Sequence, residues 1–313
     1  MTRLSVKLPA SLAEMPARAY LTKVYGLSNS EWKRLKHTGD FRQNGTPVNL
    51  TRCMVKHGDV LTFESEKPVN PAARPIAPEN LPLDIRYEDD VLLAINKPAP
   101  MLVHPLAHEP HGTLANAVLG YYARTGEAHH FHPLHRLDRA TTGLVLIAKR
   151  PELQHMLTKG GKKLFHRAYL AIACGTLPEK SGWIDLPLGR KPGSHIEQCV
   201  LPKEKGGKAA QTHYKVLAET SPAPGKIFSL LRLTLATGRT HQIRVHLAAL
   251  GAPLLGDTLY GAPSPLIARQ ALHAYELSFR HPLTGEEIRV TAPPPADFRA
   301  ACEALSLPAP AIS

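Results

Sequence analysis

The segment HRLDRATTG, residues 135–143, places the carboxylate of Asp138 between two guanidinium groups. Positive charge on both sides favours the ionised form of this carboxylate. An ionised carboxylate near a pocket can act as a nucleophile or a general base, and the flanking arginines can hold a phosphate backbone. Asp138 is therefore a candidate catalytic residue. The alternative is a structural aspartate that caps backbone N–H groups of its own turn.

A second candidate, Arg244, lies in the polar segment TGRTHQIRVHL. Thr240 is a suitable N-cap for a helix over residues 240–250. On that helix Ile243 and Leu247 lie four residues apart, so they share one apolar face. The apolar neighbours of Arg244 favour partial burial over a surface position. A buried guanidinium needs a carboxylate or phosphate partner.

A third segment, FHRAYLA, has a basic residue two positions before Tyr169 at the start of an apolar strand. A tyrosine offers a π-face to a planar base and a phenolic oxygen for proton transfer. The alternative is a strand tyrosine that only packs in the core.

These three segments, in this order and spacing, resemble the RluA-type family of RNA pseudouridine synthases. The resemblance covers nearly the whole chain and extends to residues 87–98, 103–105, 112–117 and 208–214. It implies that Asp138 is the catalytic aspartate and that Arg244 pairs with it and orients it. It also implies that Tyr169 stacks on the target base and that Arg136 fills the space left by the flipped base.

The sequence departs from the family pattern at three positions. Ala140 stands where aspartate is common, Thr142 where serine is usual, and Arg167 where lysine is usual. Thr142 keeps the hydroxyl and Arg167 keeps the charge, so only the contacts of the turn at Ala140 are in doubt.

The formal charge of +12 and the pI of about 9.6 predict a polyanionic partner, with nucleic acid first. Aromatic residues are only 6% of the chain, so we expect electrostatic contacts to dominate over base stacking. The residues expected to bind RNA are Arg136, Arg139, His135, Thr142, Arg239, His241, Gln242, Lys33, Arg34 and Lys36.

Pseudouridine formation breaks the N1–C1′ bond, turns the uracil and rejoins it through C5, so it needs no cofactor. The target uridine must leave its stack to be reached. Asp138 can attack C1′, attack C6 or remove the 2′ proton, and it is the catalytic residue in each of these three reactions. The 17 histidines include a cluster at residues 129–135, but no paired cysteines accompany it, so we expect no metal site. A non-catalytic RNA-binding protein would not need all three candidate residues.

The N-terminal residues predict a small unit. We expect helices over residues 16–25 and 31–37, with Pro16 at a first helical position. A hairpin about Asn44-Gly45 has strands 41–43 and 48–50, and a turn at 56–59 precedes a strand. This order resembles the S4-like RNA-binding module. The alternative is an appendage whose basic residues are only solvated. The predicted boundaries are 1–66 for this unit, 67–82 for a proline-rich linker and 83–313 for the catalytic domain.

The larger part predicts an α+β fold, a mixed and largely antiparallel sheet flanked by helices. Its strands do not alternate regularly with helices, which argues against a doubly wound parallel sheet. The expected strands are 91–95, 144–148, 168–173, 213–217 and 228–235, and the expected helices are 113–124, 151–159 and 240–250.

The four cysteines form no C-x-x-C pair, which fits a reducing compartment. No signal peptide or membrane-spanning stretch is evident, so we expect a cytoplasmic protein without membrane or metal partners, and a monomer. The expected substrate is structured RNA, with 23S ribosomal RNA first and transfer RNA as the alternative.

Overall fold

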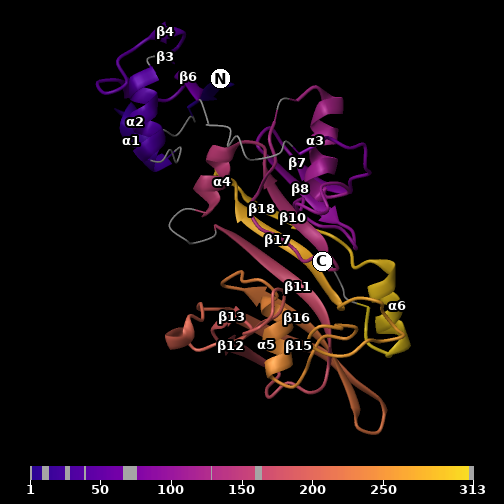
Figure 1. Ribbon diagram of the computed structural model, residues 1–313. Helices are drawn as coiled ribbons and strands as arrows, with labels where there is room; N and C mark the ends of the chain where they lie inside the picture. Colours follow the sequence, from indigo (N-terminus) through magenta and orange to yellow (C-terminus); the bar gives the residue numbers. More distant parts are fainter. Residues whose placement is uncertain are drawn as a thin grey trace.

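The computed structural model describes residues 2–8, 14–24, 29–38, 40–65, 76–127, 129–158 and 164–309, to which all structural statements refer. The larger part is a mixed α+β fold, as the sequence predicts (Figure 1).

The N-terminal residues form a small unit with its own apolar core, which includes Leu21, Trp32, Leu35 and Phe63. A four-stranded sheet has the order β1-β6-β3-β4, and β2 pairs with β5. The elements are β1 (Thr2–Lys7), β2 (Met15–Pro16), α1 (Ala17–Ala19), η1 (Tyr20–Val24), α2 (Asn29–Thr38), β3 (Phe41–Gln43), β4 (Thr46–Pro47), β5 (Met54–Val55) and β6 (Val60–Ser65).

The helix predicted over residues 16–25 is divided into α1 and the π-helix η1, and Pro16 precedes it instead of opening it. The predicted second hairpin strand at 48–50 is wrong. Asn44 and Gly45 form a two-residue turn with φ angles of 53° and 82°, so Thr46 already pairs with Gln43. The turn predicted at 56–59 is confirmed.

The predicted linker falls largely on residues 66–75, which lie outside the described residues. Residues 76–84 follow without helix or strand. The domain boundaries therefore stay predictions.

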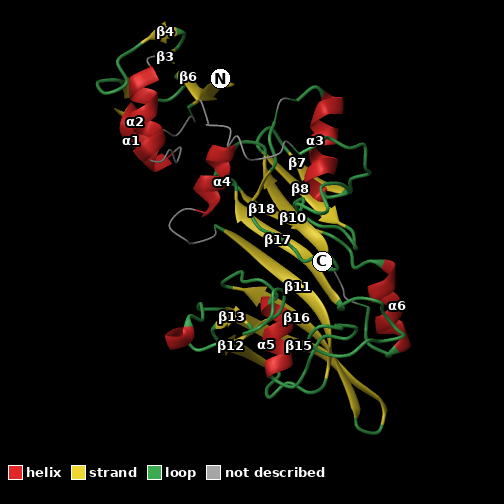
Figure 2. Ribbon diagram, viewed as in Figure 1, coloured by secondary structure: helices red, strands yellow, loops and turns green. Residues whose placement is uncertain are grey.

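A ten-stranded sheet is the frame of the larger part (Figure 2). Its order is β12-β15-β16-β11-β17-β10-β8-β7, with β18 beside β17 and β9 beside β10. All of its pairs are antiparallel except β10 with β17. The strands are β7 (Ile85–Glu88), β8 (Leu92–Lys97), β9 (His132–Pro133), β10 (Thr142–Ala148), β11 (Phe165–Cys174), β12 (Ser181–Asp185), β15 (Gln211–Ala223), β16 (Lys226–Leu235), β17 (Leu272–Arg280) and β18 (Glu287–Thr291).

Helices cover both faces of this sheet. Alternate residues of β10 enter different cores: Val145 packs in the cluster of α3 and α5, and Leu146 packs in the cluster of α4. The cluster of α6 lies against β11 and β16. The helices are α3 (Leu114–Thr125), α4 (Pro151–Thr158), α5 (Gln242–Ala249) and α6 (Ala296–Ala304).

The five predicted strands and three predicted helices of this part are present, each with shifted ends. The sequence analysis missed β7, β12, β17, β18, α6 and the small pair of β13 (Leu188–Arg190) and β14 (Gln198–Val200). The missed β17 lies at the centre of the sheet. Its His273 and Glu276 interrupt the apolar run, and such runs are the signal by which the sequence analysis recognises strands.

Gly143 explains how β10 can start beside β17. Its φ angle is 114°, and a Cβ at this position would lie 2.2 Å from the carbonyl oxygen of Ala274. Only glycine combines this conformation with such a close approach. The segment that carries Asp138 is thereby joined directly to the centre of the sheet.

Candidate active site

The loop between β9 and β10 carries Asp138, and buried side chains from elsewhere hold each of its last residues. Lys97, at the end of β8, donates from Nζ to the carbonyl oxygens of Pro98 (2.8 Å), Met101 (2.9 Å) and Arg139 (3.2 Å). Burial lowers the pKa of Lys97 to about 7, against the opposing effect of the Asp138 charge.

The next three residues, of which Thr142 opens β10, are held by Arg269 and Gln270 before β17 and by His273 within it. Arg269 donates from Nη1 to the carbonyl oxygen of Ala140 at 3.2 Å. Gln270 donates from Nε2 to the hydroxyl of Thr141 at 3.1 Å. The hydroxyl of Thr142 lies 2.9 Å from Nδ1 of the buried His273. The loop is therefore fixed in place before any substrate binds, as efficient catalysis requires.

The contact with His273 predicts an acid dependence of stability. Nε2 of His273 donates to the carbonyl oxygen of Ala292 at 3.1 Å, so Nδ1 is left to accept from Thr142. Burial lowers the pKa of His273 from 6.5 to about 4. Unfolded chains therefore bind one more proton between these values, and the free energy of unfolding should fall by about 3 kcal/mol as the pH drops through this window. Chemical denaturation at several pH values measures it.

The comparison for this prediction is His273→Gln, which cannot titrate. Its unfolding free energy should lack this part of the pH dependence. An identical pH dependence in the two proteins would contradict the prediction.

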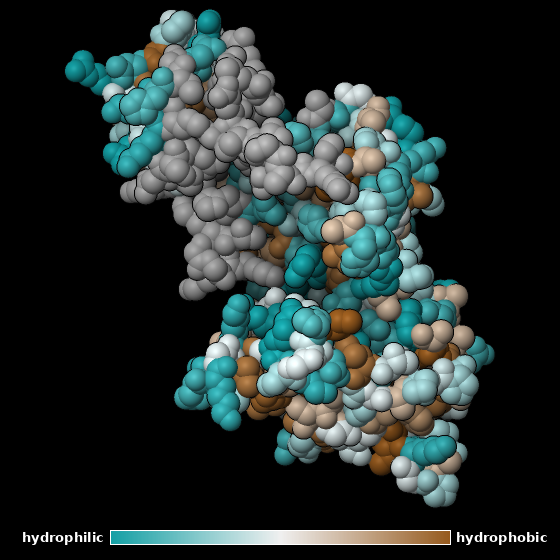
Figure 3. Space-filling view, in the orientation of Figure 1, coloured by the Kyte–Doolittle hydropathy of each residue, from teal (hydrophilic) through white to brown (hydrophobic). Residues whose placement is uncertain are grey.

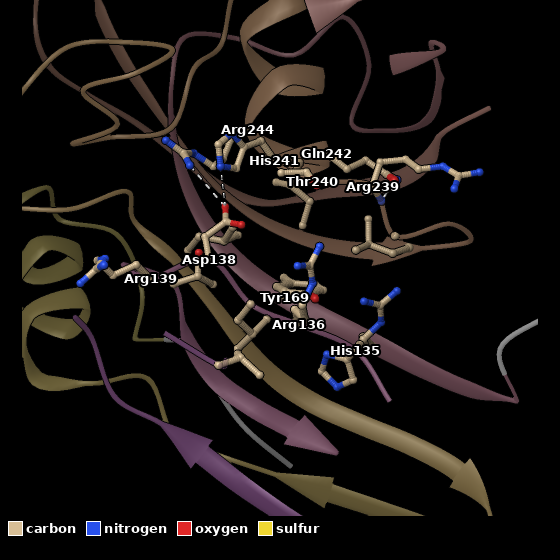
Figure 4. Close-up of a pocket in the computed structure, with 18 of the residues that line it drawn as sticks. His135, Arg136, Asp138, Arg139, Tyr169, Arg239, Thr240, His241, Gln242 and Arg244 are labelled. Atoms are coloured by element: carbon tan, nitrogen blue, oxygen red, sulfur yellow. Dashed lines mark hydrogen bonds and ion pairs between the residues drawn. The ribbon is translucent and has the colours of Figure 1, made fainter. Parts of the chain in front are cut away.

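A cavity of about 380 Å³ opens above the loop (Figure 4). Its walls come from residues 102–106, the loop itself, the start of β11, and the segment that leads into α5. The three residues that the sequence analysis proposed as catalytic, Asp138, Tyr169 and Arg244, all line it.

Arg244 connects the catalytic loop to α5. Its Nη1 lies 3.3 Å from Oδ2 of Asp138, and its Nε and Nη2 donate to the two oxygens of Asp257 at 2.7 and 2.8 Å. Burial lowers the pKa of Arg244, but the two carboxylates outweigh it and raise the pKa above its usual value. The sequence analysis expected one anionic partner for a buried Arg244, and the structure provides two carboxylates.

The alternative of Asp138 as a turn cap receives no support. In the described part of the chain, its carboxylate contacts Arg244 and His241 and receives no hydrogen bond from a backbone N–H group. Its side chain is 27% exposed, so one side of the carboxylate faces the cavity.

Asp257 is a site residue that the sequence analysis missed. It is 1% exposed and also accepts hydrogen bonds from the backbone N–H groups of Leu259 (3.0 Å) and Tyr260 (3.2 Å). Burial raises its pKa, but Arg244 and these N–H groups outweigh the burial and hold the pKa below its usual value. The only signal in the sequence is that a buried arginine needs an anion.

Tyr169 lies both in the apolar core and at the wall of the cavity. It is 4% exposed and belongs to the main apolar core, and it also lines the cavity. Burial raises its pKa, and the neighbouring Arg167 partly opposes this. Arg167 is itself buried and lines the cavity, with its Nη2 3.4 Å from the carbonyl oxygen of Thr237.

The expected N-cap of the helix at Thr240 is wrong. α5 begins after His241, which adopts the left-handed conformation with φ of 56°. Thr240 is exposed, and Gln242 instead accepts the N–H of Arg239 at 2.9 Å.

Several residues expected to bind RNA are held by the protein itself. Thr142 is buried on His273 and does not line the cavity, so its assignment as an RNA contact is corrected to a structural one. His135 lines the cavity, but it is 6% exposed and its Nε2 accepts the N–H of Leu146. Gln242 also lines the cavity. Its side-chain amide accepts hydrogen bonds from the segment before α5 and donates to Gln211 and Thr212 of β15.

The arginines at the cavity differ in their availability. Arg136 is exposed and lines the cavity. Arg139 is also exposed, but both of its terminal nitrogens contact the carboxylate of Glu109. Arg239 is exposed with its Nε 3.0 Å from the carbonyl oxygen of Ala209. All three can present charge to RNA at the cavity mouth.

The three basic residues of the N-terminal unit lie on α2. Lys33 and Lys36 are exposed. The side chain of Arg34 lies outside the described residues. Lys33 and Lys36 are not among the described residues that line the cavity, so their contact with RNA stays a prediction.

The described residues contain no group of three or more His, Cys, Asp or Glu side chains arranged to hold a metal ion. None of their helices has the length and apolar character needed to cross a membrane.

Comparisons with known proteins show the family of this chain. The family model of RNA pseudouridylate synthase matches residues 91–249. The chain is 42% identical to the ribosomal large subunit pseudouridine synthase D of Pasteurella multocida, over 84% of this chain and 82% of that protein. It is 38% identical to the enzyme of the same name from Vibrio parahaemolyticus, over 97% and 92%.

A solved structure shares the fold. The human RNA pseudouridylate synthase domain containing 1 superposes with a TM-score of 0.57 and 26% identity, over 70% of this chain and 87% of that one. The chain belongs to the RNA pseudouridine synthase family and is an RNA pseudouridine synthase, an isomerase.

Proposed function

We propose that this protein isomerises specific uridines of large-subunit ribosomal RNA, with Asp138 as its catalytic carboxylate. The observation that carries the proposal is the contact of 3.3 Å between Asp138 and the buried Arg244 at the wall of the cavity. The two relatives named above, which are called large-subunit pseudouridine synthases, support this choice of RNA.

The proposed roles follow from the chemistry. Arg244 orients the carboxylate of Asp138 through their contact of 3.3 Å. Tyr169 stacks on the uracil through its ring at the cavity wall. Breaking the N1–C1′ bond frees the uracil to turn within the cavity. C5 then bonds to C1′ and releases its proton, and N1 takes up a proton, so the product is an isomer of the substrate. No oxidant or group donor enters this balance.

RNA is bound by positive charge around the cavity. We assign phosphate contacts to Arg139 and Arg239. Lys33, Arg34 and Lys36 are proposed to extend this contact from an S4-like unit of residues 1–66. The formal charge of +12 supports such a footprint.

We also propose that the protein acts in the cytoplasm as a monomer. Its unpaired cysteines fit a reducing compartment. On the face shown in Figure 3, hydrophobic residues lie in separate patches among hydrophilic ones, as on a monomer surface.

The direct test incubates the purified protein with unmodified ribosomal and transfer RNA and maps pseudouridine by carbodiimide treatment. New sites in large-subunit RNA are expected. Sites confined to transfer RNA would contradict the proposed substrate but leave the activity intact. No site in either RNA would contradict the function.

Arg136 provides a separate prediction about base flipping. Its guanidinium is exposed at the cavity, and we propose that it fills the gap that the flipped uridine leaves. Arg136→Ala should therefore lower kcat by about tenfold or more on a uridine stacked in a helix. On the same uridine placed in an unpaired bulge the loss should be small, since less unstacking is needed. Single-turnover rates on the two RNAs measure the difference.

The matched control is Arg190→Ala, which removes an exposed arginine that does not line the cavity. It should affect both RNAs equally. Equal losses on the two RNAs for Arg136→Ala would contradict its role in flipping.

A further inference from the structure

One turn, residues 256–260, contacts both groups that reach Asp138. Its first connection runs through Asp257, which binds Arg244 at two points. Its second runs through Tyr260, whose hydroxyl lies 2.8 Å from Nδ1 of His241. Nε2 of that imidazole lies 3.9 Å from Oδ2 of Asp138.

The two connections are themselves tied together. Asp257 accepts the backbone N–H of Tyr260 at 3.2 Å. The ring of Tyr260 also packs under the guanidinium of Arg244, with 5.0 Å from Cζ to the ring centre. A displacement of this turn would therefore move Arg244 and His241 together.

The hydrogen bonds of Tyr260 select one tautomer of His241. The phenolic oxygen already accepts the N–H of Gln198 at 2.8 Å. Within the described residues, Nδ1 of His241 is the acceptor available to the phenolic proton. The phenol then donates to Nδ1, and the ring carries its proton on Nε2.

Electrostatics favours the same tautomer. A bare Nε2 lone pair would point toward the carboxylate of Asp138, whereas an Nε2–H group presents a positive edge to it. Burial lowers the pKa of His241, so the imidazole is neutral and carries one proton to place. Its left-handed backbone at φ 56° is a strained conformation that the surrounding contacts maintain.

We propose that Tyr260 is a positioning residue that fixes His241 as the Nε2–H tautomer, so that His241 and Arg244 together hold Oδ2 of Asp138 and leave Oδ1 to react. In the described part of the chain, both contacts of the Asp138 carboxylate are made to Oδ2. The distance of 3.9 Å shortens to a hydrogen bond when substrate closes the site, as catalytic contacts often do.

This inference rests on the proposed role of Asp138, but its first test does not measure activity. Nitrogen NMR of the full-length protein labelled with ¹⁵N-histidine reports which ring nitrogen is protonated, and His241→Asn identifies the signal. His241 should be protonated at Nε2 in the wild type. Tyr260→Phe removes the donor, and its His241 signal should change to a mixture of tautomers. Protonation at Nδ1 in the wild type, or an unchanged signal in Tyr260→Phe, would overturn the proposal.

A double-mutant cycle tests whether Tyr260 acts through His241. Tyr260→Phe should lower kcat by about tenfold with KM nearly unchanged. In the background of His241→Asn, a residue that tolerates the left-handed conformation, the same change should have almost no effect. Tyr121→Phe is the control, because its hydroxyl binds Glu88 at 2.8 Å outside the cavity. It should leave kcat unchanged.

Additive losses in the cycle would show that Tyr260 acts only through packing, and would overturn the proposal. Turnover by Asp138→Asn would instead remove the proposed function, and the tautomer measurement would still stand by itself.

Discussion

Asp138→Asn is expected to bind RNA as the wild type does and to form no pseudouridine. The amide has nearly the same shape as the carboxylate, so the loop and the contact with Arg244 should persist. It cannot ionise, however, and therefore cannot act as a nucleophile or a base. We expect kcat to fall by more than about 10³-fold, to the background without enzyme. Release of tritium from RNA labelled at C5 of uridine measures it, because closure through C5 expels that hydrogen.

The control for this variant is Asp185→Asn, which alters an exposed aspartate at the end of β12. Its carboxylate accepts a hydrogen bond from the side chain of Gln211 at 2.8 Å. It should release tritium at the wild-type rate. Tritium release by Asp138→Asn above the background without enzyme would refute the assignment of Asp138.

Arg244→Lys is expected to fold but to lose about 10²-fold in kcat. A lysine keeps one positive charge between Asp138 and Asp257, yet it has no planar fork to bind Asp257 at two points. Arg244→Met should in addition lower the stability of the fold, because it leaves the carboxylate of Asp257 buried without a cation. That loss is about 3–5 kcal/mol of unfolding free energy. Tritium release and chemical denaturation measure the two effects.

The matched controls are Arg289→Lys for Arg244→Lys and Arg289→Met for Arg244→Met. Arg289 also bonds a carboxylate through two nitrogens, at 3.0 and 2.6 Å to Glu276, but its side chain is 54% exposed. Solvent screens an exposed pair, so the changes at Arg289 should leave the unfolding free energy nearly unchanged. Similar losses of stability for Arg244→Met and Arg289→Met would show that burial of the Arg244 pair is not decisive.

The chemistry of the site could be predicted from local segments because the residues concerned have specific neighbours. The apolar positions around Arg244 predicted burial and hence an anionic partner, and the structure supplies that partner. Asp257 could not be found in this way. It lies 13 residues further along the chain, in a turn whose position depends on how the chain returns to the sheet.

Residue type alone also could not separate groups that face the cavity from groups that hold the loop. Thr142 and Gln242 are polar residues of the kind that often bind ligands, but both make hydrogen bonds to other residues of the protein. The distinction depends on His273 and Thr212, which come from distant strands. For the same reason β17 was missed, since its polar His273 is buried only through such partners.

The way in which the catalytic loop is held has a consequence for the synthesis of the protein. Residues 139–142 receive their bonds from positions 42 to 131 residues away, and three of these four contacts come from residues 269–273. Asp138, Tyr169 and Arg244 are all synthesised before that segment. A nascent chain therefore contains every reacting group but no ordered site, and it stays inactive until residues 269–273 emerge from the ribosome and join the sheet.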